Sequence, residues 1–218
     1  MQEYLQATSF MDYEQPIVQD FIQKNTKPGA SLFDNALQLF YAVRDQIRYD
    51  PYSFSDKEEN FKASYVLEQQ KGWCVPKSVL YGAVCRAIGV PAQLGFADVK
   101  NHLSTENMRK KMKTDIFHWH GYTSVYLKDK WVKATPAFNI QLTEKFRLKP
   151  LDFNGLEDSI YHEFDQSGNK HMEYLKERGL YADLPLAEML KDFDLYYPNY
   201  IQDGKGNFDQ EVDQEVAQ

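Results

Sequence analysis

Apolar positions in the first half of the chain recur with helical spacing. Between residues 31 and 49 the apolar side chains lie three to five residues apart, at Leu32, Leu37, Phe40, Val43 and Ile47. This spacing is typical of an amphipathic helix. Shorter helices are predicted at residues 16–24 and 63–70 by the same reasoning.

The segment after Lys71 contains the signals of a second long helix. Pro76 suits the first turn of a helix, where a missing N–H costs nothing. An apolar stripe follows, and Gly89 and Pro91 are typical of a helix end. These signals place Cys74 at the N-terminus of this helix.

The period changes to two after the second helix. Residues 91–99 predict a strand, and residues 120–128 and 130–135 predict a hairpin around a turn at 129–130. Residues 100–117 are polar and predict a loop or a short helix. The chain after Arg147 is expected to be mixed helix and loop, with a frayed acidic end.

No repeat, low-complexity tract or linker divides the chain. We therefore expect a core at residues 1–146 and a C-terminal extension at residues 147–218 that packs on the core. A chain of 218 residues can bury such a core without disulfides or metals.

Composition and charge exclude several classes of protein. Hydrophobic residues make up 43% of the chain, which is too much for a disordered protein, and the net charge is −7. An acidic chain lacks the basic field that nucleic acid or an anionic membrane requires. The N-terminus has no signal-peptide pattern, and no apolar run reaches the roughly 20 residues that span a bilayer. We expect a cytoplasmic protein that binds neither nucleic acid nor membrane.

Cys74 is the first candidate for chemistry. The positive end of a helix lowers the pKa of a thiol, and the thiolate is the nucleophile. A buried structural cysteine is the alternative for Cys74 and the preferred interpretation for Cys85, which lies mid-helix. Two cysteines make neither a disulfide framework nor a zinc site, so no metal or organic cofactor is expected.

Two histidines begin the predicted hairpin. His118 and His120 flank Trp119, and strand alternation places both imidazoles on one face. A cysteine at a helix start and a histidine on a strand form an arrangement in which the imidazole takes the thiol proton.

Two motifs resemble those of the transglutaminase-like superfamily. The first is GWCVPKSVLYGAVCRAIGVPAQLGF at 72–96, and the second is HGYTSVYLKDKWVKATP at 120–136. The upstream AVRDQIRYDPYSF at 42–54 is similar to the segment that precedes the cysteine motif, and the whole resemblance covers about residues 35–146. In this register His120, and not His118, falls on the family histidine.

The resemblance implies an α+β fold with a papain-like core. A helix that starts at the catalytic Cys74 would pack on an antiparallel sheet that carries His120. Family members cleave or exchange amide and thioester acyl groups through an acyl-enzyme, on substrates that differ widely. We expect a cysteine hydrolase that acts on a peptide, protein or small amide. The alternatives are a catalytically silent peptide-binding module and an amine acyltransferase.

The sequence departs from the family at the residue that orients the histidine. Thr135 stands where the family has Asp, and a Thr hydroxyl supplies no charge to an imidazolium. Asn139 is a second candidate, because a turn centred on 129–130 would set it opposite His120. Asp98 and Asn101 are further alternatives.

An oxyanion needs two converging donors. The backbone N–H of Cys74 is the natural first donor. The side chain of Gln69 or Gln70, or the indole of Trp73, is a candidate for the second. We expect Trp73, Gln70 and Trp119 to contact the substrate.

Overall fold

The computed structural model describes residues 1–101, 104–160, 172–198 and 206–216. The α-helices are α1 (Pro16–Asn25), α2 (Leu32–Gln46), α3 (Ala63–Gln69), α4 (Cys74–Ala87), α5 (Glu106–Met112), α6 (Ile140–Lys145), α7 (Leu186–Tyr196) and α9 (Phe208–Val216). Short 3-10 helices are η1 (Gln2–Leu5), η2 (Pro51–Ser53) and η3 (Glu58–Phe61). The strands are β1 (Arg48–Tyr49), β2 (Lys71–Gly72), β3 (Ala92–Asn101), β4 (Ile116–Leu127), β5 (Lys130–Ala134) and β6 (Met172–Tyr181).

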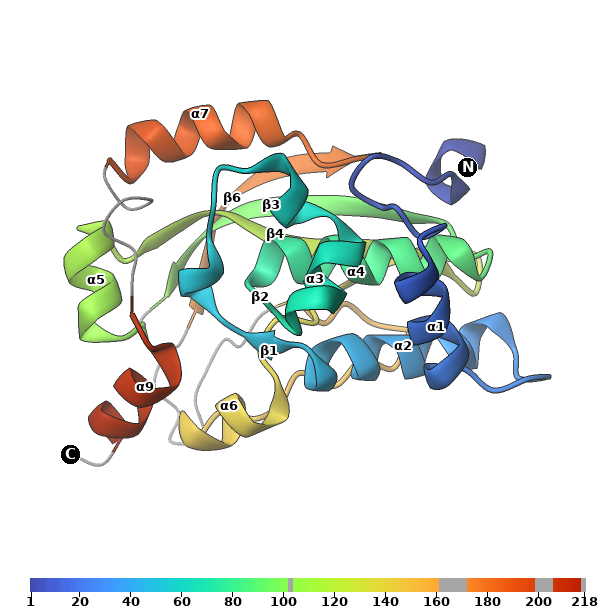
Figure 1. The fold of residues 1–218 in the computed structure, drawn as a ribbon, viewed down its shortest axis with the longest axis horizontal. Helices are drawn as coiled ribbons and strands as arrows, with labels where there is room; N and C mark the ends of the chain where they lie inside the picture. Colours follow the sequence, from blue (N-terminus) through green and yellow to red (C-terminus); the bar gives the residue numbers. More distant parts are fainter. Residues whose placement is uncertain (102–103, 161–171, 199–205, 217–218) are drawn as a thin grey trace.

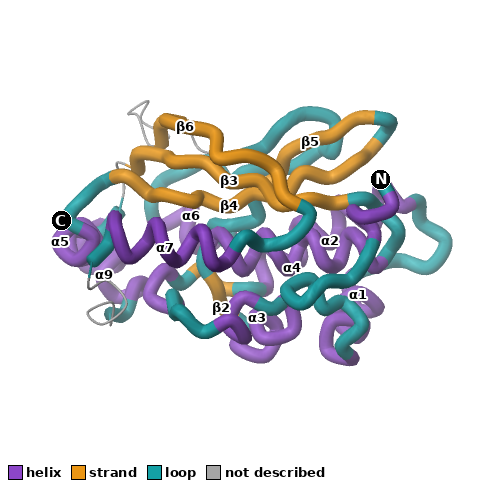
Figure 2. The backbone as a smooth tube through the Cα atoms, turned by 90° about the horizontal axis from the view of Figure 1, so that it is seen from above, coloured by secondary structure: helices purple, strands orange, loops and turns teal. Residues whose placement is uncertain are grey.

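The main sheet is antiparallel and has the strand order β5-β4-β3-β6. Figure 2 shows this sheet as one layer and α2 and α4 beneath it. A separate parallel pair, β1 and β2, lies directly before α4 in the fold. The expected α+β class, with helices packed on an antiparallel sheet, is confirmed.

Helix α4 is the centre of the core. Each residue from Cys74 to Arg86 is buried, because α4 lies between the sheet and α2 and α3. The Thr123 hydroxyl of β4 donates to the carbonyl of Ser78 at 2.8 Å. Because α4 is buried on all sides, its polar residues Lys77, Ser78 and Arg86 are buried along with the apolar stripe.

Lys77 fastens α4 to two other parts of the fold. Its ammonium is fully buried and donates to the carbonyls of Arg44 (2.9 Å), Ile47 (2.5 Å) and Ala137 (2.7 Å). Burial lowers the pKa of Lys77, whereas three carbonyl acceptors match the three N–H donors of the charged form. The side chain thereby fixes the start of α4 against the end of α2 and the segment after β5.

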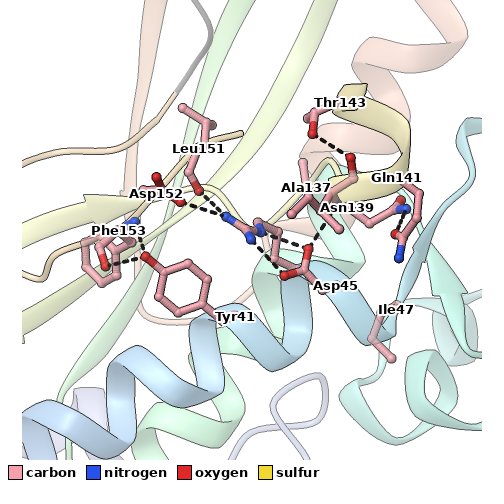
Figure 3. Close-up of polar contacts among 12 residues, drawn as sticks. Tyr41, Asp45, Ile47, Ala137, Asn139, Gln141, Thr143, Leu151, Asp152 and Phe153 are labelled. Atoms are coloured by element: carbon pink, nitrogen blue, oxygen red, sulfur yellow. Dashed lines mark hydrogen bonds and ion pairs between the residues drawn. The ribbon is translucent and has the colours of Figure 1, made fainter. Parts of the chain in front are cut away.

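A polar cluster ties α2 to the segments that follow the hairpin. The Arg44 guanidinium pairs with Asp45 at 2.8 Å and donates to the carbonyl of Leu151 at 2.7 Å. Asp45 also accepts from the backbone N–H of Ile140 at 3.0 Å, at the start of α6. Figure 3 shows these contacts converging beside the end of α2.

The C-terminal part of the chain completes the sheet. Residues 172–181 form β6, which pairs with β3 from Leu94 to Asn101. The sequence predicted only mixed helix and loop here, because β6 is an edge strand with several exposed charged side chains. Residues 147–218 therefore supply part of the main sheet and are more than an extension packed on it.

The expectation of a frayed acidic end is wrong for residues 208–216. These residues form α9, in which Phe208 and Val212 are buried one turn apart. Glu211 accepts hydrogen bonds from Tyr52 (2.7 Å), Thr105 (2.8 Å) and Asn107 (2.6 Å). Figure 1 shows α9 beside α5, at the end of the molecule away from α1.

The hairpin turn lies one residue earlier than expected, at Lys128 and Asp129, so each residue pairs with a partner two positions earlier than predicted. Leu127 pairs with Lys130, so paired residues sum to 257 (127 + 130) and not to 259. The two turn residues, Lys128 and Asp129, have φ of 49° and 64°, which is the geometry of a type I′ hairpin turn. The expectation that Asn139 lies opposite His120 is wrong, since this sum would set residue 137 there.

Candidate active site

Cys74 begins α4 and is 6% exposed. The backbone N–H groups of Cys74, Val75 and Gly121 hydrogen-bond with its thiol. Two of these donors belong to the first turn of α4, and the third comes from β4. The thiol therefore lies where the helix start meets the strand.

His120 directly precedes Gly121 on β4 and is also 6% exposed. A Cβ atom on Gly121 would lie 3.0 Å from the Cα atom of Val75, so β4 and the start of α4 are in close backbone contact. This approach brings Cys74 and His120 to the wall of one pocket. The two groups are thus on the same side of the molecule, as a nucleophile and its base must be.

The pocket encloses about 570 Å³, including the part that is open to solvent. Its lining residues come from segments before α4, from α4, from β4 and from the helices α5 and α7. They are Tyr49, Pro51, Phe54, Trp73, Cys74, Met108, Met112, Phe117, His118, His120, Phe193 and Tyr197. All of them are apolar or aromatic except the cysteine and the two histidines.

The comparison with known protein families agrees with this arrangement. Residues 16–136, more than half of the chain, match the transglutaminase-like superfamily. The chain belongs to this superfamily. The match includes both Cys74 and His120.

Among solved structures, the chain is similar to the crystal structure of a "Putative Cysteine Protease" from Cytophaga hutchinsonii. The two share 16% sequence identity with a TM-score of 0.47. The similarity covers 82% of this chain and 53% of the other, so the chain spans about half the length of that protein. No curated protein matches the chain.

The pKa of the Cys74 thiol differs from the sequence-based expectation. Burial raises it to about 11, although the three backbone N–H groups act to lower it. A lowered thiol pKa was expected from the helix N-terminus alone, and that expectation is wrong because desolvation outweighs the backbone donors.

Thr135 does not take the place of the family Asp. Its hydroxyl is buried and makes no hydrogen bond with any residue that the structure describes. Its backbone N–H donates to the carbonyl of Ser159 at 2.8 Å, which continues the strand pairing past β5. The prediction that Thr135 orients His120 is therefore wrong for the hydroxyl group.

Asn139 is also committed elsewhere. Its side-chain oxygen accepts from the backbone N–H of Tyr49 at 3.1 Å, and its nitrogen donates to Gln141 at 2.8 Å. Figure 3 shows the amide directed to Gln141 at the start of α6. Asn139 joins β1 to α6, and the prediction that it orients His120 is wrong.

Asp98 pairs with the other histidine. Its carboxylate lies 3.0 Å from Nδ1 of His118 and forms two contacts with the guanidinium of Arg178. Burial alone raises the pKa of Asp98, but hydrogen bonds from His118, Arg178 and the backbone of Trp119 lower it to about 2. In the sheet, His120 lies opposite Ala97, whereas Asn101 pairs with Met172 further along β3.

A β-bulge separates the two histidines. The pairing of β3 with β4 shifts register between Ala97 and Val99, and Trp119 has a φ of 60°. The side chain of Trp119 is fully buried, and its indole donates to Asp192 at 2.9 Å. The prediction that Trp119 contacts substrate is wrong, because the bulge sends its ring to Phe96 and Tyr181.

Of the remaining residues predicted to contact the substrate or the oxyanion, Trp73 lies at the pocket and the two glutamines do not. Trp73 lines the pocket and packs against Phe54 and Phe193, with ring centroids 5.4 and 6.0 Å apart. Gln70 ends α3 with a φ of 53°, and its amide donates to the carbonyl of Leu67 at 2.5 Å. Gln69 and Gln70 are exposed and lie outside the pocket lining. Neither is placed to serve as an oxyanion donor.

Sequence reasoning missed the part of the pocket wall that α5 and the α7 region supply. Met108 and Met112 of α5 and Phe193 and Tyr197 of the α7 region are buried there. Each pair is spaced four residues apart, which is typical of any helix with an apolar face. No local signal distinguishes a pocket wall from an ordinary core contact.

No helix within residues 1–101, 104–160, 172–198 and 206–216 is long and apolar enough to cross a membrane. The same described segments contain no group of three or more His, Cys, Asp or Glu side chains that could hold a metal ion.

Proposed function

We propose that the protein is a cysteine-dependent acyl-transfer enzyme that hydrolyses an amide or a related acyl bond. Cys74 is the nucleophile and His120 is the general acid and base. The observation that carries this proposal is the shared pocket, whose wall includes both the thiol of Cys74 and the imidazole of His120.

The first step is attack of the Cys74 sulfur on the substrate carbonyl. As the sulfur attacks the substrate carbonyl, its proton passes to His120 and a carbon–sulfur bond forms. A thiol with a pKa near 11 requires this transfer to accompany the attack, because little thiolate is present beforehand. The N–H groups at the start of α4 and of Gly121 are the available donors for the oxyanion.

The second half of the reaction restores the enzyme. The carbon–nitrogen bond breaks as His120 returns the proton to the leaving amine, which leaves a thioester on Cys74. Water then attacks the thioester, His120 takes a proton from the water, and the carboxylic acid and the thiol are released. Water is the default acceptor, and an amine in its place would make the protein an acyltransferase.

The test is acylation of the native protein by an activated acyl donor, such as a small thioester, followed by intact mass. Full-length protein is expected to gain one acyl group on Cys74, and Cys74→Ala and His120→Gln are expected to lose it. His118→Gln is the matched control, since His118 lines the same pocket but is paired with Asp98. Acylation that survives Cys74→Ala, or that needs His118 and not His120, would contradict the assignment.

One observation favours a second candidate, a catalytically silent peptide-binding module. Thr135 replaces the family Asp, and its hydroxyl makes no hydrogen bond among the described residues. Loss of a triad carboxylate lowers kcat by about four orders of magnitude in a serine protease. Binding of peptides by wild-type protein and Cys74→Ala alike, with no acyl-enzyme from any donor, would favour the silent module.

A further inference from the structure

We infer that the pocket beside Cys74 binds an apolar side chain of the acyl part of the substrate, aromatic or branched aliphatic, and excludes charged ones. This inference rests on the proposed function and specifies the substrate class of the same site. It concerns the residue whose carbonyl is attacked, which must lie against the wall that carries the thiol.

The composition of the wall carries the inference. Among the residues lining the pocket in the described part of the chain there is no Asp, Glu, Lys or Arg. An ionised substrate side chain that entered the pocket would lose its contacts with water and would meet no side chain of opposite charge among these lining residues. Burial of such an unpaired charge is unfavourable in free energy. An apolar substrate side chain would bind favourably, because both its own surface and the apolar surface of the wall would be removed from water.

The shape of the wall favours a ring or a branched chain. Trp73 and Phe193 stand with centroids 6.0 Å apart and tilted by 54°, and Phe54 packs on both. Met108 and Met112 of α5 also line the pocket. Methionine side chains are flexible and adapt to different apolar shapes, so the pocket is suited to a range of apolar groups more than to one.

The polar groups are confined to the reacting edge. Cys74 and His120 come from the α4–β4 contact, and His118 is held by Asp98 at 3.0 Å. His118 also stacks on Tyr196, with centroids 3.8 Å apart and planes 19° apart. One ring nitrogen of His118 is thus held by Asp98 and one face of its ring by Tyr196.

The test uses a panel of N-acetyl aminoacyl thioesters that differ only in the side chain: Phe, Leu, Gly, Gln, Lys and Glu. The rate of Cys74 acylation in the full chain is followed by intact mass. Phe and Leu are expected to react at least about tenfold faster than Gly, since their side chains leave water when they enter the pocket. Lys and Glu are expected to be slowest, and equal rates or a preference for Gln would overturn the inference.

A variant pair tests the wall directly. Met112→Glu is expected to lower the rate with the Phe donor at least about tenfold and to raise that with Lys relative to Phe. Met112→Leu conserves volume and is expected to stay within about threefold of wild type. The donor panel on wild-type protein decides the question even where Met112→Glu fails to fold.

A binding measurement separates this inference from the proposed function. Amides of N-acetyl-Phe and N-acetyl-Glu are titrated against Cys74→Ala protein by ligand-observed NMR. Selective binding of the Phe amide without acylation of wild-type protein would reject the enzyme and retain the pocket. Acylation of Cys74 with no preference among side chains would retain the enzyme and reject the pocket.

Discussion

Gly121 lies so close to Val75 that a Cβ atom on Gly121 would come within 3.0 Å of the Cα atom of Val75. This contact joins β4 to the first turn of α4, and it is the reason that Cys74 and His120 share a pocket. A larger side chain at the residue after the base would therefore crowd the contact between strand and helix.

Gly121→Ala is expected to weaken both the fold and the site. Overpacking of this kind costs typically about 1–3 kcal/mol in the free energy of unfolding, measured by urea denaturation. The rate of Cys74 acylation is expected to fall further than stability explains, since the thiol loses its contact with the Gly121 N–H. Gly72→Ala is the control, because a Cβ there meets only ordinary contacts at 3.5 Å or more.

Alkylation of Cys74 is expected to rise with pH well beyond the range of an ordinary thiol. Burial raises the pKa of Cys74 to about 11, so the thiolate fraction grows about tenfold per pH unit below that value. Iodoacetamide labelling of the native protein, read by intact mass between pH 7 and 10, measures the slope. A plateau below pH 8 would instead indicate a thiolate paired with an imidazolium.

Cys85 is the internal reference for this measurement. Burial raises its pKa to about 12, and the residue is fully buried inside α4. It is expected to stay unlabelled in the native protein over the same pH range and to react after unfolding. Equal labelling of both cysteines in native protein would contradict a site at Cys74.

Asp98 is expected to make the fold sensitive to acid. Its pKa is about 2 in the fold against an ordinary value of 3.8, so its ion pairs stabilise the protein above pH 4 and are lost as the pH falls from about 4 to 2. The shift corresponds to roughly 2 kcal/mol. Asp98→Asn is expected to remove about this much at pH 7 and to flatten the acid limb of a plot of stability against pH.

The matched control for Asp98 is Asp115→Asn. Asp115 pairs with Lys100 at 3.1 Å, but both side chains are more than a third exposed. Exposed pairs contribute about 0–1 kcal/mol, so little change is expected. A similar loss of stability in both variants would show that burial of Asp98 is not the cause.

Lys77→Met is expected to destabilise the protein strongly without touching the pocket. The variant keeps the length of the side chain but leaves the carbonyls of Arg44, Ile47 and Ala137 without their buried donor. Each orphaned group costs about 1–3 kcal/mol, and a loss of several kcal/mol in urea denaturation is expected. Lys110→Met, which removes an exposed ion pair with Glu106, should be near neutral.

Helix α9 is expected to hold α5 in place over the pocket. Glu211→Gln weakens the acceptor shared by Tyr52, Thr105 and Asn107, and amide hydrogen exchange in residues 106–112 is expected to accelerate. Gln214→Ala, on the exposed side of α9, is the control. Unchanged exchange in α5 in Glu211→Gln would mean that its own core contacts suffice.

The helical half of the fold could be predicted closely. Periodic apolar positions and terminal signals gave α1, α2, α3 and α4 to within a few residues, and the long β-branched runs gave β3 and the hairpin. These signals are local, because they depend on spacing along one element. β6 could not be predicted in this way, because it is an edge strand with exposed charged side chains. Its conformation depends on pairing with β3 and not on a pattern within its own sequence.

The orienting residue was predicted wrongly for a similar reason. Strict alternation and an assumed turn centre set Asn139 opposite His120, but the type I′ turn at Lys128 and Asp129 moved the register by two residues. The bulge at Trp119 then turned its ring away from the pocket. Turn type and bulges depend on φ angles that neighbouring strands select, and a single sequence carries only weak signals of them.

The amino-acid sequence by itself determined the family, the helix that begins at Cys74 and the strand that carries His120, because motif spacing and apolar periodicity are properties of short segments. Only the tertiary structure decided that burial raises the pKa of the thiol, that Asp98 pairs with His118, and that α5 and α7 close an apolar pocket around the reacting groups. Desolvation and ion pairing depend on what surrounds a side chain in space, and those surroundings come from segments far apart in the chain.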